Sequence, residues 1–410
     1  MYYKSLTLAG AMALLSSTAF AGCGISGGNI SILSNAYAAI NAVTARAAEC
    51  ADGDIEATIN NTKEHRDLQV AALSASPAQY SSAVISNGSI IPLLSEGLLR
   101  PLDDLVAKHG AALKPSQLIT MDGKIMAIAF MANAQHLFYR SDILEKAGVG
   151  APSTYEDVIA AAEAIRAAGL MEYPVALNTK TGWNLGEEFV NMYAGTGVPM
   201  FKPGSAEVAI NNDHGVATLK MLKALTGYSN PDFLTFDSDV TQALWEAGDL
   251  AIATLWATRA GKILDNEGST EAITSTTILA AAPTWGGGEK PASTLWWDGF
   301  TIAKNASEAD AEATFIAMMN GISTDMVKAN NDLANWLIEG YVPSASAEGF
   351  AATVMAGASP YPMLPYMGTL HTALGAELSD FLQGTESAEQ ALADVEAAYT
   401  ANATEKGFLK

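Results

Sequence analysis

The chain has 410 residues, of which 49% are hydrophobic and 16% are charged. This length exceeds the size at which one hydrophobic core stops growing, so we expect two packed units, and the composition excludes a disordered or collagen-like chain. Because 22 Lys and Arg face 44 Asp and Glu, the formal net charge is −22, and a polyanion such as nucleic acid is a poor candidate partner.

The first 21 residues have the pattern of a bacterial secretory signal. A short basic start at Met1–Lys4 precedes the apolar run Leu6–Leu15, and Ala19–Ala21 forms a small-residue cleavage site. No later run approaches the roughly 20 uncharged residues that a membrane-spanning helix needs. We therefore predict a signal peptide over residues 1–21 and a mature protein in the periplasm.

The only two cysteines, Cys23 and Cys50, lie near the new N-terminus. In an oxidising compartment a single pair is expected to form a disulfide. The alternative is a lipoprotein, because Phe20–Cys23 is similar to a lipobox and an acylated Cys23 could not pair with Cys50. Phe where Leu is usual makes lipid anchoring the weaker alternative.

Short β-prone runs alternate with helical patterns in the first part of the chain. Strands are predicted at 29–33, 55–59 and 82–85, and helices at 36–48, 64–73 and 90–99. This alternation predicts crossover units and a largely parallel sheet.

The alternation returns after a middle segment, which predicts a second α/β unit. Strands are expected at 137–140, 174–177 and 250–254, and helices at 155–168, 187–193 and, near the end, 377–400. Gly- and Pro-rich stretches at 148–152, 199–204 and 283–291 punctuate the chain, and none is a long flexible linker. We therefore expect several short crossings between the units.

Six segments, taken in order, resemble one family. They are Ser95–Asp104, Asp122–Phe130, Leu137–Asp157, Leu244–Ile252, Trp296–Lys304 and Leu382–Leu392. They are similar to the family patterns at a helix end turning through Pro-Leu-Asp, "DGK-x-aromatic-x-x-P-F", "LYYNKDLLEKAG…P-x-TW-x-D", "F-x-x-GKAAM", "G-G-x-x-x-AI" and "L-x-G-K-x-S-x-E-E-AL". In the second segment Met126 replaces the aromatic residue and Ala129 the proline.

The family is that of the extracellular (periplasmic) solute-binding proteins of ABC importers, of the carbohydrate-binding family 1 type. The resemblance implies an α/β, two-lobed, type II-like periplasmic-binding-protein fold whose lobes are joined by several hinge crossings and close on a ligand. We expect a first lobe of residues 22–132 and 285–335 and a second lobe of residues 133–284 and 336–410.

A sugar offers an apolar C–H face and a rim of hydroxyls, so a sugar site needs an aromatic plate with hydrogen-bonding side chains beside it. Trp183 stands in a polar turn between a strand and a helix, where an apolar plate is exposed unless something covers it. Trp256, just after a predicted strand, is a second candidate, whereas Trp245 is expected in the core.

The segment Trp296–Gly299 is another candidate, because the resemblance places the start of this strand at the lobe junction. Neighbouring strand residues point to opposite faces, so only one of the two Trp can line a given side, and we predict that Trp297 or Asp298 faces the ligand. Gly299 permits a close approach of the backbone.

Polar residues also follow the predicted strands of the first lobe, and ligands of open α/β sheets bind outside the carboxyl ends of the strands. The candidates there are Asn35, Tyr37, His65, Asn87 and Ser89, with Glu64 and Ser86 beside them. Helix capping and turn formation are the competing roles.

Four further residues are candidate ligand contacts. Asn133 and His136 lie in the proposed hinge, where family members often place a polar contact; Arg259 could donate to hydroxyls or a carboxylate; and Tyr366 lies in a Pro-rich loop that could cover the ligand.

We expect a non-catalytic protein without metal or cofactor, and no catalytic residues. The chain lacks HExxH and Walker patterns, and Gly24–Gly28 matches G-x-S-x-G without the strand that this motif requires. The predicted partners are a small solute, a sugar or polyol, and the permease of an ABC importer, with a monomeric protein. A neutral solute is preferred because few basic residues occupy the candidate loops. The alternatives are an anionic solute held by Arg259 and His136, or a secreted carbohydrate-active enzyme.

Overall fold

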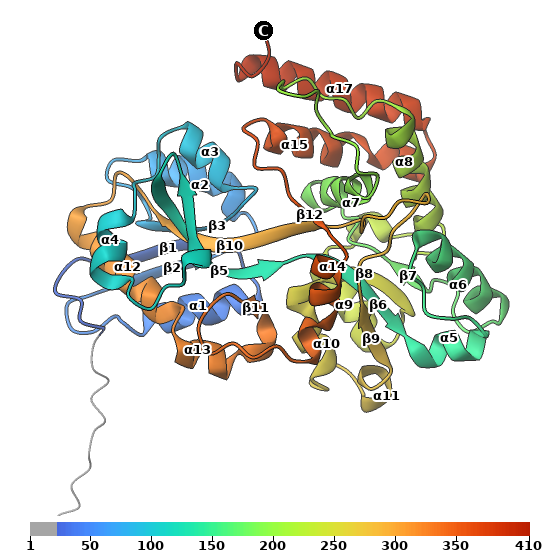
Figure 1. Ribbon diagram of the computed structural model, residues 1–410, viewed down its shortest axis with the longest axis horizontal. Helices are drawn as coiled ribbons and strands as arrows, with labels where there is room; N and C mark the ends of the chain where they lie inside the picture. Colours follow the sequence, from blue (N-terminus) through green and yellow to red (C-terminus); the bar gives the residue numbers. More distant parts are fainter. Residues whose placement is uncertain (1–22) are drawn as a thin grey trace, which may run out of the picture.

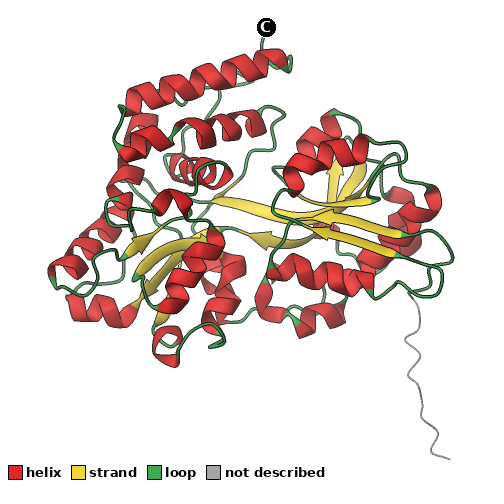
Figure 2. Ribbon diagram, turned by 180° about the vertical axis from the view of Figure 1, so that it is seen from behind, coloured by secondary structure: helices red, strands yellow, loops and turns green. Residues whose placement is uncertain are grey.

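The structure, a computed structural model, describes residues 23–410, so the predicted signal peptide lies outside the described residues. Two lobes lie side by side and two long strands run from one toward the other (Figure 1). Each lobe contains a β-sheet flanked by helices, as the view from behind shows (Figure 2). The described chain is therefore an α/β protein with two lobes, as the sequence predicted.

The first lobe is built on an eight-stranded sheet with the strand order β11-β5-β10-β3-β1-β2, to which β4 and β12 add at β5 and β10. The strands are β1 (Ile30–Ser34), β2 (Ala57–Asn61), β3 (Ser82–Ser86), β4 (Leu118–Met121), β5 (Lys124–Asn133), β10 (Thr294–Ile302), β11 (Asn335–Trp336) and β12 (Ser359–Pro360). Strand β1 is parallel to β2 and β3, whereas β10 is antiparallel to both β3 and β5.

Helices cover this sheet because each buries an apolar stripe against it. In α1 the residues Ile40, Val43 and Ala47 recur at helical spacing and are buried. The first-lobe helices are α1 (Ala38–Ala48), α2 (His65–Ser74), α3 (Ile90–Ser95), α4 (Asp103–His109), α12 (Glu308–Gly321) and α13 (Thr324–Ala329).

The second lobe is built on a four-stranded sheet of order β7-β8-β6-β9. Its strands are β6 (Gln135–Arg140), β7 (Val175–Ala176), β8 (Ile252–Trp256) and β9 (Thr277–Ala280). Its helices are α5 (Ser141–Ala147), α6 (Tyr155–Ala167), α7 (Trp183–Ala194), α8 (Asp213–Thr226), α9 (Ser238–Ala247), α10 (Ala260–Leu264), α11 (Glu271–Thr274), α14 (Glu348–Met355), α15 (Met367–Glu377), α16 (Ser379–Gln383) and α17 (Ala388–Glu405).

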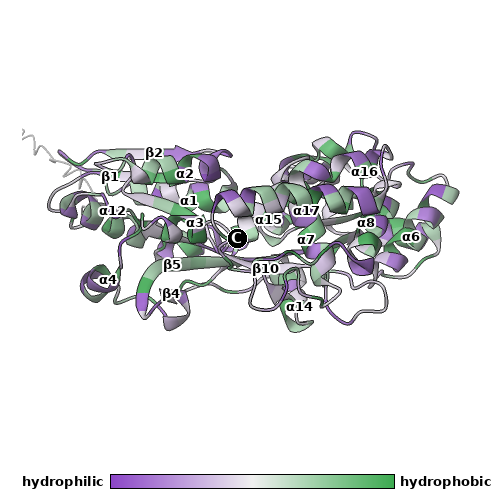
Figure 3. Cartoon of the chain, turned by 90° about the horizontal axis from the view of Figure 1, so that it is seen from above, coloured by the Kyte–Doolittle hydropathy of each residue, from purple (hydrophilic) through white to green (hydrophobic). Residues whose placement is uncertain are grey.

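The chain passes between the lobes more than once. Strand β5 of the first sheet is followed after Ala134 by β6 of the second sheet. Trp285 still packs in the second lobe, where its indole donates to the Met192 carbonyl, and the chain rejoins the first sheet at Thr294. After β11 the chain returns to the second lobe, where α14 packs against β6 and β9. Figure 3 shows β10 between the two lobes from above, with β5 beside it in the first lobe.

Three expectations about elements need correction. The first sheet is parallel among β1, β2 and β3 and between β10 and β12, whereas β10 is antiparallel to β3 and β5. In the second sheet β6 is antiparallel to both its neighbours. The strands that cross between the lobes enter each sheet from the opposite direction. The single helix expected over 377–400 is broken into α16 and α17 by Gly384, whose φ of 84° ends a helix. The helix expected over 90–99 ends at Ser95.

The predicted disulfide is present and joins Cys23, ahead of β1, to Cys50, just after α1. None of the helices formed by residues 23–410 is both long and apolar enough to span a bilayer.

Candidate functional site

Three tryptophans from three separate elements meet at the junction of the lobes. Trp183 begins α7, Trp256 ends β8 and Trp296 lies near the start of β10. The Trp183 ring centroid lies 6.3 Å from that of Trp256 and 5.6 Å from that of Trp296. Trp256 and Trp296 are buried and Trp183 is half-buried. We call these three residues the aromatic cluster.

His371, on α15, holds the aromatic cluster in place. Its ring stacks on Trp183 with centroids 4.9 Å apart. Its Nε2–H donates to the Trp183 carbonyl at 2.8 Å, which leaves Nδ1 to accept from the Tyr361 hydroxyl at 2.9 Å. Burial lowers the pKa of His371 to about 3, so this ring is neutral and the direction of both bonds is set. Tyr361 in turn packs on Trp296 at 4.1 Å.

Two consecutive buried glutamates of α7 face the same region. Glu187 Oε1 accepts from the Trp296 indole and the Thr294 hydroxyl, both at 3.0 Å. Its Oε2 has no hydrogen-bond partner among residues 23–410. Burial raises the pKa of Glu187 to about 8 and that of Glu188 to about 7. The sequence pattern suggested only a helix start here, whereas both carboxyls lie inside.

The first lobe contributes polar groups from the carboxyl ends of its parallel strands. Tyr37 follows β1 and His65 follows β2, and Asn87 follows β3. Three buried atoms here lack a hydrogen-bond partner within the described chain: His65 Nδ1, Asn87 Oδ1 and Ser86 Oγ. Buried polar atoms are normally paired, so these atoms are available to a ligand.

Asp298 joins this group from β10, where it pairs in register with Ser86 of β3. Burial raises the pKa of Asp298 to about 7, while Arg66 and a hydrogen bond from Tyr37 act in the opposite direction. The structure therefore brings together the predicted residues Trp183, Trp256, Asp298, Tyr37 and His65 near the lobe junction.

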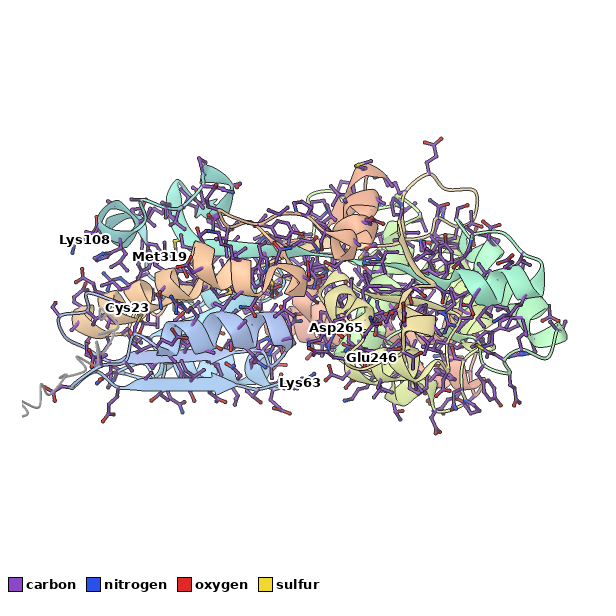
Figure 4. The ribbon with its side chains drawn as sticks, turned by 90° about the horizontal axis from the view of Figure 1, so that it is seen from below. Cys23, Lys63, Lys108, Glu246, Asp265 and Met319 are labelled. Atoms are coloured by element: carbon purple, nitrogen blue, oxygen red, sulfur yellow. A yellow bond between two sulfur atoms is a disulfide. The ribbon has the colours of Figure 1, made fainter. Side chains whose placement is uncertain are left out.

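Two cationic side chains at the start of α2, Arg66 in its first turn and Lys63 just before the helix, contact the second lobe. The Arg66 guanidinium carbon lies 4.2 Å from the centroid of the Trp183 ring. Lys63 forms an ion pair with Asp239 of α9, and Figure 4 shows Lys63 at the end of the first lobe that faces the second. The two lobes thus touch at the aromatic cluster and beside it.

Other predicted residues have different surroundings. Trp297 packs with the first-lobe apolar cluster that contains Leu33 and Ile85, so it is Trp296 that joins the aromatic cluster. Gly299 is needed for strand packing, because a Cβ there would lie 2.5 Å from the Ile128 carbonyl oxygen.

Two predicted polar residues already have partners in the second lobe. Arg259 is ion-paired with Asp239 at 2.7 Å. The Tyr366 hydroxyl donates to the Ser205 carbonyl at 2.9 Å, and its ring packs against Phe201.

The two hinge candidates are buried. Asn133 donates to the Thr258 hydroxyl at 3.3 Å and so ties the crossing to the second lobe. His136 stacks on Phe138 at 4.4 Å beneath Gly349, and burial lowers its pKa to about 4, which makes it a neutral residue.

Local turns account for two first-lobe candidates. Asn35 accepts from the Ala36 amide at 2.8 Å, and Ser89 accepts from the Ser86 amide at 3.0 Å. Both contacts stabilise local turns, which is the role that competes with ligand binding for polar residues after strands.

Sequence reasoning missed Arg66, Glu187 and His371. Each lies inside a helical pattern, where charge or polarity indicates an exposed face unless the partner surface is known. The signal that could have been used is weak: Glu187 lies four residues after Trp183, on the same helix face. Within residues 23–410 there is no group of three or more His, Cys, Asp or Glu that could hold a metal ion.

These carboxyls predict that stability falls as the pH rises. The folded-state pKa of Glu187, about 8, lies above its ordinary value of 4.5, so its contribution is complete below about pH 4.5 and is lost as the pH rises through 8. Over pH 6.5 to 8.5 Glu187 alone should remove about 2 kcal/mol from the free energy of unfolding. Glu188 and Asp298 act in the same direction.

Buried histidines act at lower pH. His65, His136 and His371 have lowered pKa values, so the stability that is present above about pH 6.5 is lost as the pH falls below 6.5.

Urea unfolding at pH 6.5, 7.5 and 8.5 tests the effect of the buried carboxyls. The free energy of unfolding should decrease from each pH to the next. Glu187→Gln should make this decrease smaller, whereas the exposed Glu145→Gln should retain it. A flat wild-type profile, or an unchanged slope in Glu187→Gln, would contradict the assignment.

Similar proteins were found by sequence. The chain is 29% identical over 195 residues to a probable ABC transporter-binding protein of Deinococcus radiodurans, covering 46% of this chain and 44% of that one. A putative binding protein of Brucella abortus is 24% identical over 189 residues, 42% of each chain. These alignments thus span less than half the length of the curated relatives.

Solved structures share the fold. Maltose-bound MalE3 of T. maritima has a TM-score of 0.77 at 19% identity and covers 91% of this chain and 99% of its own. A solute-binding protein of an ABC transporter from Agrobacterium vitis, with bound D-mannitol, has a TM-score of 0.77 at 20% identity and covers 94% of this chain and 100% of its own. At these identities the likeness establishes the two-lobed fold.

The model of one family matches residues 34–321, most of the described chain and both lobes. This match agrees with the two sheets, the repeated crossings and the polar and aromatic groups collected at the junction. The chain belongs to the bacterial extracellular solute-binding proteins.

Proposed function

We propose that this protein is the substrate-binding component of an ABC importer, which captures a sugar or polyol between its lobes and delivers it to the membrane permease. It acts as a free monomer in the periplasm and leaves the solute chemically unchanged. Cys23 is then a disulfide partner, not a lipid attachment site, in keeping with its bond to Cys50.

The observation that carries the proposal is the aromatic cluster at the lobe junction with unpartnered hydrogen-bonding atoms beside it. The half-buried Trp183 supplies an apolar plate to the C–H face of a sugar ring. Glu187 Oε2 of the second lobe and His65 Nδ1 and Asn87 Oδ1 of the first supply polar partners. An indole surface with polar atoms beside it matches a sugar, whose apolar C–H face is surrounded by hydroxyls.

Contacts from both lobes are what hinge closure requires. A ligand shifts an open–closed equilibrium only by its greater affinity for one of the two states. A solute on Trp183 that also bonds to the first-lobe residue Asn87 binds the closed state more tightly, because those groups lie on different lobes. The solved relatives bound to maltose and D-mannitol support the same class of solute.

A thermal-shift screen of the purified mature protein tests the proposal. The panel contains mono-, di- and oligosaccharides, polyols and sugar acids, with amino acids and betaine-type osmolytes as matched negatives. A saturating solute should raise the melting temperature by mass action, by an amount equivalent to about 2.7 kcal/mol at 100 times its Kd. A shift with an osmolyte and with no carbohydrate or polyol would refute the proposal.

The hit from this screen also tests for chemistry. After prolonged incubation with the protein, the recovered solute should have an unchanged NMR spectrum. Hydrolysis products at a rate proportional to protein concentration would instead indicate a carbohydrate-active enzyme.

A further inference from the structure

Arg66 is a cation of the first lobe that lies against the aromatic cluster at the lobe junction. It is the second residue of α2 and is half-buried. Its guanidinium carbon lies 4.2 Å from the Trp183 ring centroid and 5.8 Å from that of Trp296. Any solute held on Trp183 between the lobes must therefore lie within reach of this guanidinium.

The Arg66 guanidinium has no acceptor within the described chain. Among residues 23–410 no carboxylate oxygen lies within 4.0 Å of it, and it donates no hydrogen bond. Other arginines differ: Arg140 forms two bonds to Asp142, and Arg166, which also stacks on a tyrosine, donates to the Glu172 and Gly227 carbonyls. Guanidinium N–H groups only donate, and those of the half-buried Arg66 can donate to water or to an acceptor of a solute that enters between the lobes.

Arg66 keeps its positive charge around neutral pH, because a guanidinium stays protonated in proteins even though burial lowers the pKa of Arg66. Burial raises the pKa of Glu187 to about 8 and of Asp298 to about 7, so these carboxyls carry protons much of the time. Burial lowers the pKa of His65 to about 4, so that ring is neutral. Arg66 therefore places a positive charge beside carboxyls that carry protons part of the time, within a chain whose formal net charge is −22.

We infer that the solute carries a carboxylate, as a sugar acid does, and that Arg66 is the residue that selects it. The planar fork of a guanidinium donates two parallel bonds to a carboxylate, a geometry that a hydroxyl cannot match. The sugar ring meanwhile lies on the aromatic cluster. This inference rests on the proposed function and narrows it to the acidic members of the solute class.

Calorimetric titration with matched pairs tests the inference. The pairs are D-glucuronate with D-glucose, D-galacturonate with D-galactose, and D-gluconate with D-glucitol. In each pair the acid carries a carboxylate where its neutral partner carries a hydroxymethyl group. We expect the acid of at least one pair to bind at least about 10-fold more tightly than its partner. Arg66→Gln should weaken that acid by about 10- to 150-fold, as expected for hydrogen bonds to a charged group.

Two further variants make the result specific. Arg66→Lys keeps the charge but loses the fork, so it should retain part of the preference and exclude misfolding as the cause. Arg166→Gln removes another arginine stacked on an aromatic ring, 4.5 Å above Tyr228 and outside the site, and should bind as the wild type does.

The outcomes separate this inference from the proposed function. If a neutral member of a pair binds as tightly as its acid, or Arg66→Gln leaves the acid's affinity within threefold, the inference is wrong and the proposed function stands. If no carbohydrate, polyol or sugar acid of either panel binds, both are wrong.

Discussion

Replacing Trp183 with alanine is expected to weaken solute binding by about 30- to 1,000-fold, a loss of about 2–4 kcal/mol, as for other central aromatic contacts. Trp183 is the half-buried member of the aromatic cluster, and its ring contacts groups of both lobes, His371 on one and Arg66 on the other. Without the indole the solute loses its apolar surface and Arg66 loses its stacking partner. Titration of the purified variant with the solute found by thermal shift measures the effect.

A matched tryptophan separates binding from stability. Trp245 is fully buried in the second lobe, where its indole donates to the Thr277 hydroxyl at 3.1 Å, and it is not part of the aromatic cluster. Trp245→Phe should lower the melting temperature and leave the solute affinity within threefold. Equal losses of affinity in the two variants, or a Trp183→Ala variant that binds normally, would remove Trp183 from the site.

Removing the disulfide should have the largest effect on stability. The bond joins Cys23 to Cys50 across a sequence separation of 27 residues, and loop-closure entropy for such a length corresponds to about 3–4 kcal/mol. Cys50→Ser should therefore lower the free energy of unfolding of the first lobe by about this amount, because the unfolded chain is then no longer restrained by the cross-link. Urea unfolding followed by a first-lobe probe gives the value.

The reduced wild-type protein is the control, since it should unfold at the same urea concentration as Cys50→Ser. A thiol titration of the denatured, unreduced protein should find no free thiols. Two free thiols, or an N-terminal lipid detected at Cys23 by mass spectrometry, would show that the bond is absent in the cell.

Which residues of the site could be predicted depended on where they lie along their elements. Trp183 and Tyr37 stand in a polar turn or after a strand end, where a large side chain has no obvious place in a core. Asp298 lies in the middle of β10, and the family resemblance, which places this strand at the lobe junction, indicated it. Arg66 and Glu187 lie within helices, and their sequence surroundings indicate solvent-exposed faces. Their burial depends on surfaces supplied by segments more than 100 residues away in the chain.

The choice between Trp296 and Trp297 shows the same limit. Strand alternation predicted correctly that the two indoles lie on opposite sides, in two different apolar clusters. It could not say which side faces the second lobe. That depends on the register of β10 against β3 and β5, including the shift between Asp298 and Gly299.

The amino-acid sequence by itself determined the two α/β units, the disulfide partners and the family, because these follow from local periodicity, cysteine number and short ordered motifs. Only the tertiary structure decided that three tryptophans from α7, β8 and β10 meet, that Glu187 is buried with an unpartnered oxygen, and that Arg66 reaches them from the other lobe. The physical reason is that burial and charge pairing are properties of surfaces assembled from distant segments, which no local pattern of residues contains.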